Sequence, residues 1–418
     1  SLAHLEGVLL LLILPFLFFP ASFPILTAVS LLLLSFLLLL PLFTRHRPIL
    51  SCTPMNLLVL LWLIGLGVSI LITADPDKTL PQFTRFIASL IVFYAAIAAI
   101  QQRPHLTWFA YGLMALSILF ALIAPFAVQW NLAKGIPIPD AVYHSFRLLA
   151  PDAIHPNIMA SLMILLLPFP LAYVLVHVSR RELIWWLWLA VLGLTGVVLL
   201  LTKSRGGYLA ILVAALVALW LAGRRILALV LLGGTAVAIL WLLYSANDAL
   251  LLTETANGLT DPSTMQFRLQ VWQVALRMLS DFPFTGVGIG AFNDVAMRLY
   301  PIAESNNPGT HNIFLQVGVD LGLPGLIVYV ALLLLVVYMG WMTLKKARKT
   351  QDTNLQAMMI GAIAGIVGYS AHGLLDNGLW STQVSFVPWL VVALVTIAHG
   401  LAQPAQTIQS GDKNNTLC

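Results

Sequence analysis

A histidine lies where a polar stretch gives way to an apolar one, in the segment HNIFLQVGVDLGLPGL that runs from His311 to Leu326. An acid, Asp320, follows farther inside the apolar part. Ionisable side chains at membrane depth are costly and tend to be kept for function. Because a histidine can accept or release a proton near neutral pH, His311 is a candidate catalytic base. The alternative is a histidine that only satisfies hydrogen bonds at a helix start.

A basic turn, LTKSRGGY, is a candidate anion site. It places Lys203, Ser204 and Arg205 in a short hairpin between two apolar runs. Gly206 and Gly207 would let a phosphate approach the backbone where the next helix starts, and the helix dipole favours an anion there. The alternative is a pair of basic side chains that snorkel to the lipid headgroups.

A second candidate cation, Arg268, lies in the segment QFRLQVWQVALRMLS, which we predict to be a helix from Gln266 to Ser280. Its polar residues recur at spacings of three and four and form one stripe: Gln266, Gln270, Gln273, Arg277 and Ser280. At about 100° per residue, Arg268 lies on the opposite, apolar face. We therefore expect Arg268 to bind an anion, or else to pair with a structural acid such as Glu304 or Asp320, and Arg277 to face water.

Other polar residues are predicted to have structural roles. The turn DFPFTGVGIGAF has glycines at 286, 288 and 290, but no strand precedes it, so we expect backbone packing rather than a nucleotide site. Asp320 needs a cation or a hydrogen bond, for which Arg205 is the expected partner. His155 would begin a helix, and His372 with Asp376 would lie one turn apart at a helix end. Pro324 and Gly325 would bend the helix that follows His311.

The amino-acid composition indicates whether the surroundings of these groups are water or lipid. Hydrophobic residues make up 60% of the 418 residues and charged residues 9%, with a mean hydropathy of +0.95, so the surroundings must be lipid. The net charge is +5 and the pI about 9.3, but the basic residues fall mostly between apolar runs, so no nucleic-acid partner is implied. Two cysteines, Cys52 and Cys418, argue neither for a disulfide framework nor for a metal cluster.

Twelve apolar runs have about the length that spans a bilayer. They lie near 8–23, 25–43, 57–73, 83–101, 106–128, 157–177, 183–201, 206–222, 226–244, 312–342, 356–374 and 382–402. The segment before the first run lacks the basic start of a cleaved signal peptide, so we expect that run to be a retained helix. With the N-terminus in the cytoplasm, a basic residue lies in every inner loop, as the positive-inside rule requires. These inner residues are Arg45, Arg47, Arg103, Arg180, Arg181, Arg224, Arg225, Lys345, Lys346, Arg348 and Lys349.

The predicted fold class is therefore an all-α polytopic membrane protein that forms a single integral membrane domain over residues 1–418. Two outer connections are long, about 128–156 and 245–311. The second, between the ninth and tenth spans, would be a partly helical periplasmic loop carrying part of the active site. Residues 403–418 form a polar tail, expected in the cytoplasm.

The order of these motifs resembles the O-antigen ligase and O-antigen polymerase superfamily. The resemblance rests on the SRGG turn, the outer-loop Arg268 followed by Trp272, the FPFTGVGIGAF turn and the HNIFLQVGVDLGLPGL segment, which together cover roughly 203–326. It implies a metal-independent glycosyltransferase in the bacterial inner membrane that takes glycan from undecaprenyl diphosphate on the periplasmic side. The acceptor would be the lipid A core in a ligase, or another lipid-linked glycan in a polymerase.

The chemistry that this resemblance implies suits the residues. His311 would activate an acceptor hydroxyl, while Arg205 and Arg268 stabilise the departing diphosphate. Substrate contacts are expected from Lys203, Ser204, Asn312 and Asp320, with no metal and no cofactor, because no outer loop has a metal-ligand pattern. A ligase is favoured over a polymerase because one long outer loop dominates. A transporter is the alternative from another class, but the polar residues gather on one side, which favours an enzyme.

The topology can be tested with single cysteines. We expect cysteines introduced beside Arg224 and Lys345 to be cytoplasmic, and those beside Lys203, Arg268 and His311 to be outside. An impermeant thiol reagent applied to intact cells should label only the second group. Labelling beside Arg224 but not beside Arg268 would contradict the mechanism.

Overall fold

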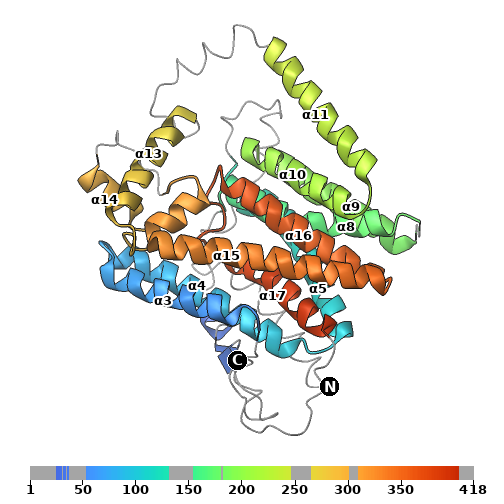
Figure 1. Cartoon of the computed structure of the whole chain (residues 1–418), viewed down its shortest axis with the longest axis horizontal. Coiled ribbons are helices and arrows are strands. Elements are labelled where there is room, and N and C mark those ends of the chain that lie inside the picture. Colours follow the sequence, from blue (N-terminus) through green and yellow to red (C-terminus); the bar gives the residue numbers. More distant parts are fainter. Residues whose placement is uncertain are drawn as a thin grey trace.

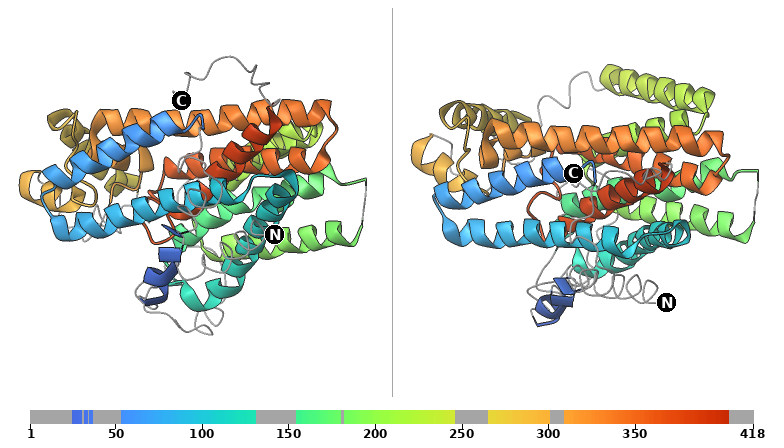
Figure 2. Two further views of the ribbon diagram at one scale, coloured as in Figure 1. Left: turned by 90° about the horizontal axis from the view of Figure 1, so that it is seen from below. Right: turned by 60° about the horizontal axis from the view of Figure 1, so that its bottom comes forward.

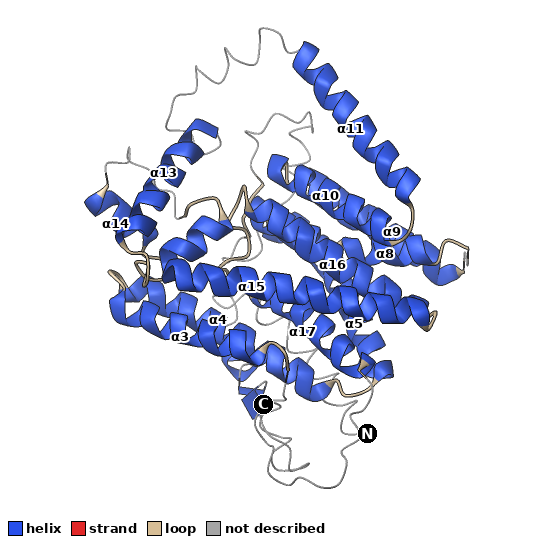
Figure 3. Ribbon diagram, viewed as in Figure 1, coloured by secondary structure: helices blue, strands red, loops and turns tan. Residues whose placement is uncertain are grey.

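A computed structural model of the chain describes residues 25–36 (except 31 and 34), 53–130, 154–179, 182–245, 265–300 and 309–403. All regular elements in these ranges are helices, as Figure 3 shows, and one isolated parallel bridge joins Val128 to Ile154. The predicted all-α class is confirmed for this part of the chain. Residues 404–418 of the predicted tail, 131–153 of the first long outer connection, and 246–264 and 301–308 of the second lie outside it.

Most of the described chain is helical, and the helices follow one another in this order. They are α3 (Asn56–Ile72), α4 (Pro76–Ala99), α5 (Arg103–Ala127), α7 (Pro156–Leu166), α8 (Pro168–Val176), α9 (Leu183–Leu201), α10 (Arg205–Leu221), α11 (Arg225–Ser245), α13 (Met265–Asp281), α14 (Phe292–Leu299), α15 (Ile313–Lys349), α16 (Thr353–Gly373) and α17 (Phe386–Ala402).

The chain is a multi-pass membrane protein. In the described ranges, six helical stretches are long and apolar enough to cross a membrane: α4, α5, α7 with α8, α9, α15 and α16. Shorter apolar helices, α3, α10, α17 and the first part of α11, match four further expected spans. The expected first span lies outside the described residues and the second is described only in part, so a total of twelve stays a prediction.

Helix α15 is the longest element and runs through the middle of the bundle (Figure 1). It packs against α3, α16 and α17, while α16 also packs against α8 and α10. Helices α13 and α14 lie against the first part of α15, and the two views in Figure 2 show the same arrangement. The sequence placed the end of this span near 342, but the helix continues to Lys349, so the basic cluster forms its last turns.

Two ion pairs join segments that the sequence places on the same side of the membrane. Lys78 contacts Asp294 at 2.7 Å, which ties the α3–α4 hairpin to α14. Arg103 contacts Asp352 at 3.1 Å, which ties the start of α5 to the start of α16. The first pair lies among the predicted outer segments and the second among the predicted inner ones. The packing is therefore consistent with the predicted topology.

Helix α15 is broken at Gly322, which has φ 72° and ψ −178°. This conformation is essentially restricted to glycine. The break separates the Val319 carbonyl from the Leu323 amide, which would bond to each other in a continuous helix. Instead, the Val287 amide donates to the Val319 carbonyl (2.8 Å), and the Leu323 amide donates to the Pro283 carbonyl (2.7 Å). The expected bend at Pro324 and Gly325 therefore begins earlier, at Gly322, because the 283–287 loop replaces the helical bond there.

The glycine-rich turn packs by its backbone, as the sequence predicted. A Cβ atom on Gly286 would lie 2.4 Å from the Val319 oxygen, and one on Gly288 would lie 2.8 Å from the Thr73 backbone. Between them and Gly290, the Ile289 amide donates to the Ser69 hydroxyl at 2.8 Å. The turn therefore lies between the break in α15 and the α3–α4 hairpin.

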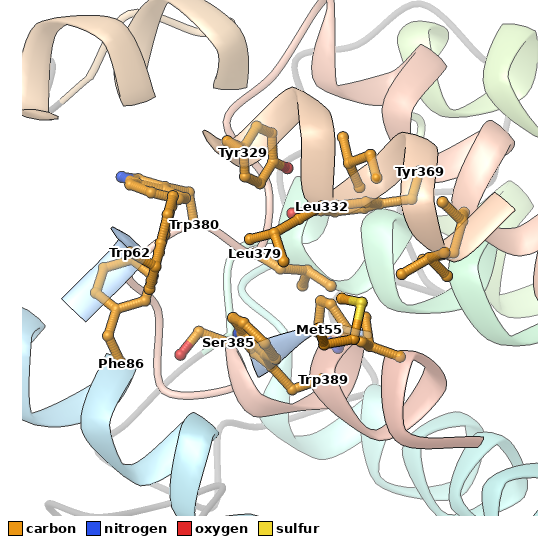
Figure 4. A pocket seen from close by; sticks show the side chains of 15 residues that line it. Met55, Trp62, Phe86, Tyr329, Leu332, Tyr369, Leu379, Trp380, Ser385 and Trp389 are labelled. Carbon is orange, nitrogen blue, oxygen red and sulfur yellow. The ribbon is translucent and has the colours of Figure 1, made fainter. Parts of the chain in front are cut away.

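Four aromatic rings pack together near the break in α15. Trp380 packs against Trp62, Phe86 and Tyr329 at centroid distances of 5.4, 4.7 and 5.7 Å. They line a mostly apolar cavity of about 590 Å³, counting its open part (Figure 4). The Trp380 indole nitrogen points away from this cavity and donates to Asp320 at 2.8 Å. The loop after α16 is thereby fixed to α15.

The close approach of the turn to the break predicts a large effect of added methyl groups. Gly286→Ala and Gly322→Ala should each lower the free energy of unfolding by about 1–3 kcal/mol, because both force a positive φ on alanine and a collision with backbone. Thermal unfolding in detergent measures this. Gly233→Ala, in α11 with nothing within 4 Å of the new methyl group, is the matched control and should be neutral or stabilising. Equal stability of all three variants would show that the loop does not hold the break.

Candidate active site

His311 lies in the turn before α15 and not in the helix itself. The helix cap is Asn312, whose side-chain oxygen accepts from the Phe314 and Leu315 amides at 3.0 and 3.1 Å. His311 has φ 51°, a conformation that non-glycine residues seldom adopt. The preceding Thr310 is held on both sides, because its amide donates to Gln316 and its carbonyl accepts from Trp272 of α13. The turn therefore presents His311 in a fixed position.

The acid beside His311 is Asp376, in the loop that follows α16. Its Oδ2 atom lies 3.7 Å from His311 Nδ1, a distance for an ion pair rather than a hydrogen bond. Oδ2 also accepts from the Asn157 side chain at 2.6 Å, and Oδ1 accepts from the Gly378 amide at 2.8 Å. Burial alone would raise the pKa of Asp376, but His311, His372 and the Gly378 amide together hold it well below its ordinary value. Asp376 is therefore a buried, ionised partner for His311.

Arg268 comes from α13 on the face that the periodicity predicted. It is half-buried, whereas Gln266, Gln273 and Arg277 are exposed. Its guanidinium donates to the Leu375 carbonyl at 2.8 Å, and its Nε atom is buried without a hydrogen-bond partner. Burial lowers the pKa of Arg268; Asp376 opposes this effect and the nearby Arg205 adds to it. The alternative pairing of Arg268 with Asp320 does not occur, and Glu304 lies outside the described residues.

Arg205 is the first residue of α10 and is exposed. Within the described ranges it forms no ion pair, and its positive charge acts on that of Arg268. Its turn lies against the end of α16, since a Cβ atom on Gly206 would be 3.3 Å from Leu375 Cβ. Arg205, Arg268 and His311 therefore all adjoin one short segment, residues 372–378, which we call the α16 end.

The structure corrects the partners predicted for Asp320. This residue is fully buried, and its carboxylate accepts from Gln316 at 2.9 Å and from Trp380 at 2.8 Å. The Gly290 amide also hydrogen-bonds to it. The expected pairing with Arg205 is wrong, because neutral donors already satisfy the carboxylate inside the protein. Its contacts therefore position the loop and the helix start, and they leave no exposed face for a substrate.

Three other expected substrate contacts face the protein. Ser204 is buried and caps α10, with its hydroxyl accepting from the Gly207 amide at 3.3 Å. Asn312 uses its oxygen as the α15 cap, and its Nδ2 atom donates to the Leu374 carbonyl at 3.2 Å. Lys203 is 3% exposed, so it does not snorkel on the surface. Arg205 is exposed, and Arg268, His311 and Asn312 are half-buried, so these four remain candidates for contact with a ligand.

Asp376 and Asn157 are the functional candidates that sequence reasoning missed. The sequence shows a His and an acid one turn apart in HGLLDNGLW, and we predicted only a structural helix end there. The asparagine of HPN was passed over, although the predicted helix start is correct, since His155 caps α7. Nothing local indicates that Asp376 meets His311. In the ranges described, no three His, Cys, Asp or Glu residues group as a metal site would require.

This arrangement can remove a proton beside a bound anion. Asp376 on the Nδ1 side favours the tautomer that leaves His311 Nε2 as the acceptor, and it stabilises the imidazolium once a proton arrives. Two arginines that share one neighbourhood repel each other, and an anion between them relieves that repulsion. The α16 end therefore brings a candidate base next to a candidate anion site.

The ionised state of Asp376 predicts a defined pH behaviour. Asp376→Asn should lower the free energy of unfolding by about 2 kcal/mol, because an amide cannot accept from both Asn157 and Gly378. The pKa of Asp376 is lower in the folded than in the unfolded chain, so its stabilisation is present above the unfolded pKa and lost only as the pH falls through the folded one. Melting curves of both proteins should therefore differ at pH 5 as at pH 8. A difference that vanished between these values would mean that burial dominates instead.

One family model matches part of the chain. Residues 188–330, about a third of the chain, match the family model described as O-antigen ligase. The matched segment contains Arg205, Arg268 and His311, and it ends before the α16 end. No curated protein matches the chain. The match supports the resemblance that the motifs indicated: residues 188–330 of this chain are similar to the O-antigen ligase family.

Proposed function

We propose that this protein transfers a glycan from undecaprenyl diphosphate to an acceptor hydroxyl on the periplasmic face of the bacterial inner membrane. The acceptor is the lipid A core, so the activity is that of an O-antigen ligase. One observation carries the proposal: Arg205, Arg268 and the His311–Asp376 pair adjoin the same short α16 end. A base and two cations are what transfer from a lipid diphosphate requires.

His311 acts as the base. Its Nε2 atom takes the proton of the acceptor hydroxyl while the acceptor oxygen forms the new bond to the anomeric carbon. Asp376, 3.7 Å from Nδ1, holds the ring and stabilises the positive charge that develops on it. Such assistance contributes about 10² to 10⁴ in rate.

Arg205 and Arg268 hold the leaving group. The bond from the anomeric carbon to the diphosphate oxygen breaks, and the negative charge that develops on the diphosphate is placed between the two guanidinium groups. Arginine suits this role because its planar fork binds phosphate oxygens in pairs and stays charged. The unpartnered Nε of Arg268 supports the assignment, since it leaves a buried donor for the ligand. The arginines take the place that a divalent cation has in other enzymes, so the reaction needs no metal.

The predicted test separates chemistry from donor binding. His311→Ala should lose transfer by about 10² to 10⁴ while it keeps donor affinity. Arg205→Ala and Arg268→Ala should weaken donor binding about tenfold or more, because each removes a charge-assisted contact. Undecaprenyl diphosphate binding in detergent and single-turnover transfer from a lipid-linked glycan measure the two effects. Wild-type turnover in folded His311→Ala would eliminate it as the base.

Arg277→Ala is the matched control, because Arg277 lies on the same helix as Arg268 but on its exposed face. If Arg268→Ala and Arg277→Ala lose donor affinity equally at unchanged protein levels, the face of the helix on which Arg268 lies does not explain its role. The assay contains EDTA, and turnover restored only by magnesium or manganese would contradict metal independence. Lipid A core and lipid-linked glycan are offered as separate acceptors. Product on the second alone would make the enzyme a polymerase.

A further inference from the structure

A buried histidine that the proposed mechanism does not use, His372, lies between two serines. It belongs to the last turn of α16 and is 1% exposed. Its Nδ1 atom lies 2.8 Å from the Ser161 hydroxyl of α7, and its Nε2 atom lies 3.4 Å from the Ser204 hydroxyl. The ring therefore bridges α7 and the start of α10.

The direction of these hydrogen bonds follows from the donors and acceptors available. The Ser161 hydroxyl donates to the Asn157 carbonyl at 2.9 Å, so its oxygen accepts from His372 Nδ1. In a neutral ring, Nε2 is then an acceptor, and the Ser204 hydroxyl donates a hydrogen bond to it. The Ser204 oxygen remains able to accept from the Gly207 amide, which is the cap of α10. Each of these hydrogen bonds therefore has one donor and one acceptor, with no conflict among them.

This chain of hydrogen bonds joins the two halves of the site. At one end, Ser204 caps the helix whose first residue is Arg205. At the other end, the Asn157 side chain donates to Asp376, the acid beside His311. His372 lies between these ends and touches neither reacting group. Its position therefore sets the distance from the anion site to the base.

The surroundings leave His372 little freedom. A Cβ atom on Gly206 would lie 3.6 Å from His372 Cδ2, and one on Gly378 would lie 3.9 Å from His372 Nδ1. Two charged groups act on the ring, namely Asp376 from its own segment and Arg268 from α13, and they carry opposite charges. A shift of the ring would have to move the start of α10 or the loop that carries Asp376.

We propose that His372 is a positioning residue, which holds Arg205 at the start of α10 in register with the His311–Asp376 pair through its hydrogen bonds to Ser204 and Ser161. This inference rests on the proposed function, because it assumes that Arg205 binds the donor diphosphate. It adds to that function a residue outside the segment matched by the family model.

The test compares His372→Phe with His372→Gln. Phenylalanine keeps a ring but loses both hydrogen bonds, and it should weaken undecaprenyl diphosphate binding about fivefold to tenfold. Glutamine offers one donor and one acceptor, so it should recover most of the affinity. In the Arg205→Ala background, His372→Phe should have no further effect, because its effect passes through Arg205. The control is His399→Phe, which removes a similar contact to Thr343 far from the site and should leave binding unchanged.

The outcomes separate the two proposals. Wild-type donor affinity in folded His372→Phe, or a loss that adds fully to that of Arg205→Ala, overturns the positioning role. Glutamine no better than phenylalanine also overturns it, because ring volume would then matter and hydrogen bonds would not. Unchanged affinity in Arg205→Ala overturns the proposed donor site itself. If His372→Phe does not fold, Ser161→Ala removes one bond of the same chain and should weaken binding in the same direction.

Discussion

The backbone hydrogen bond that is missing from α15 is the constraint on which the rest of the site depends. The Val319 carbonyl and the Leu323 amide cannot meet across Gly322, and unpaired backbone groups inside a membrane protein cost several kcal/mol each. The 283–287 loop satisfies both groups with its own backbone. The loop is consequently fixed to the helix by two backbone hydrogen bonds, although it contains no regular structure.

The docked loop determines where the preceding and following segments lie. It continues from α13, so it fixes the helix that carries Arg268. It also brings the Gly290 amide to Asp320, whose other partners are Gln316 and Trp380. Through Gln316, the buried acid reaches the turn of His311. Through Trp380, it reaches the loop that carries Asp376. Asp320, which is fully buried, therefore orders both His311 and Asp376.

Among the described residues, the α16 end concentrates positive charge that neighbouring side chains do not neutralise. Arg205 and Arg268 act on each other with the same sign, and Asp376 is already engaged by His311, Asn157 and Gly378. Such an arrangement costs stability, and positions of this kind persist where they serve binding. In the proposed role of His372, its hydrogen bonds to Ser204 and Ser161 keep Arg205 and the His311–Asp376 pair close together despite the repulsion between the arginines.

The sequence by itself determined the membrane class, the apolar spanning helices of the described part and the face of α13 on which Arg268 lies. These features follow from local periodicity and hydropathy, which depend on residues close in the chain. It also named Arg205, Arg268 and His311 as candidates, because their types and turn contexts are local properties. Only the tertiary structure decided that Asp376 is the acid beside His311, and that the bend begins at Gly322 rather than at Pro324. Both outcomes depend on which distant segment supplies a hydrogen-bond partner, and helix packing sets that choice without leaving a periodic pattern in the chain.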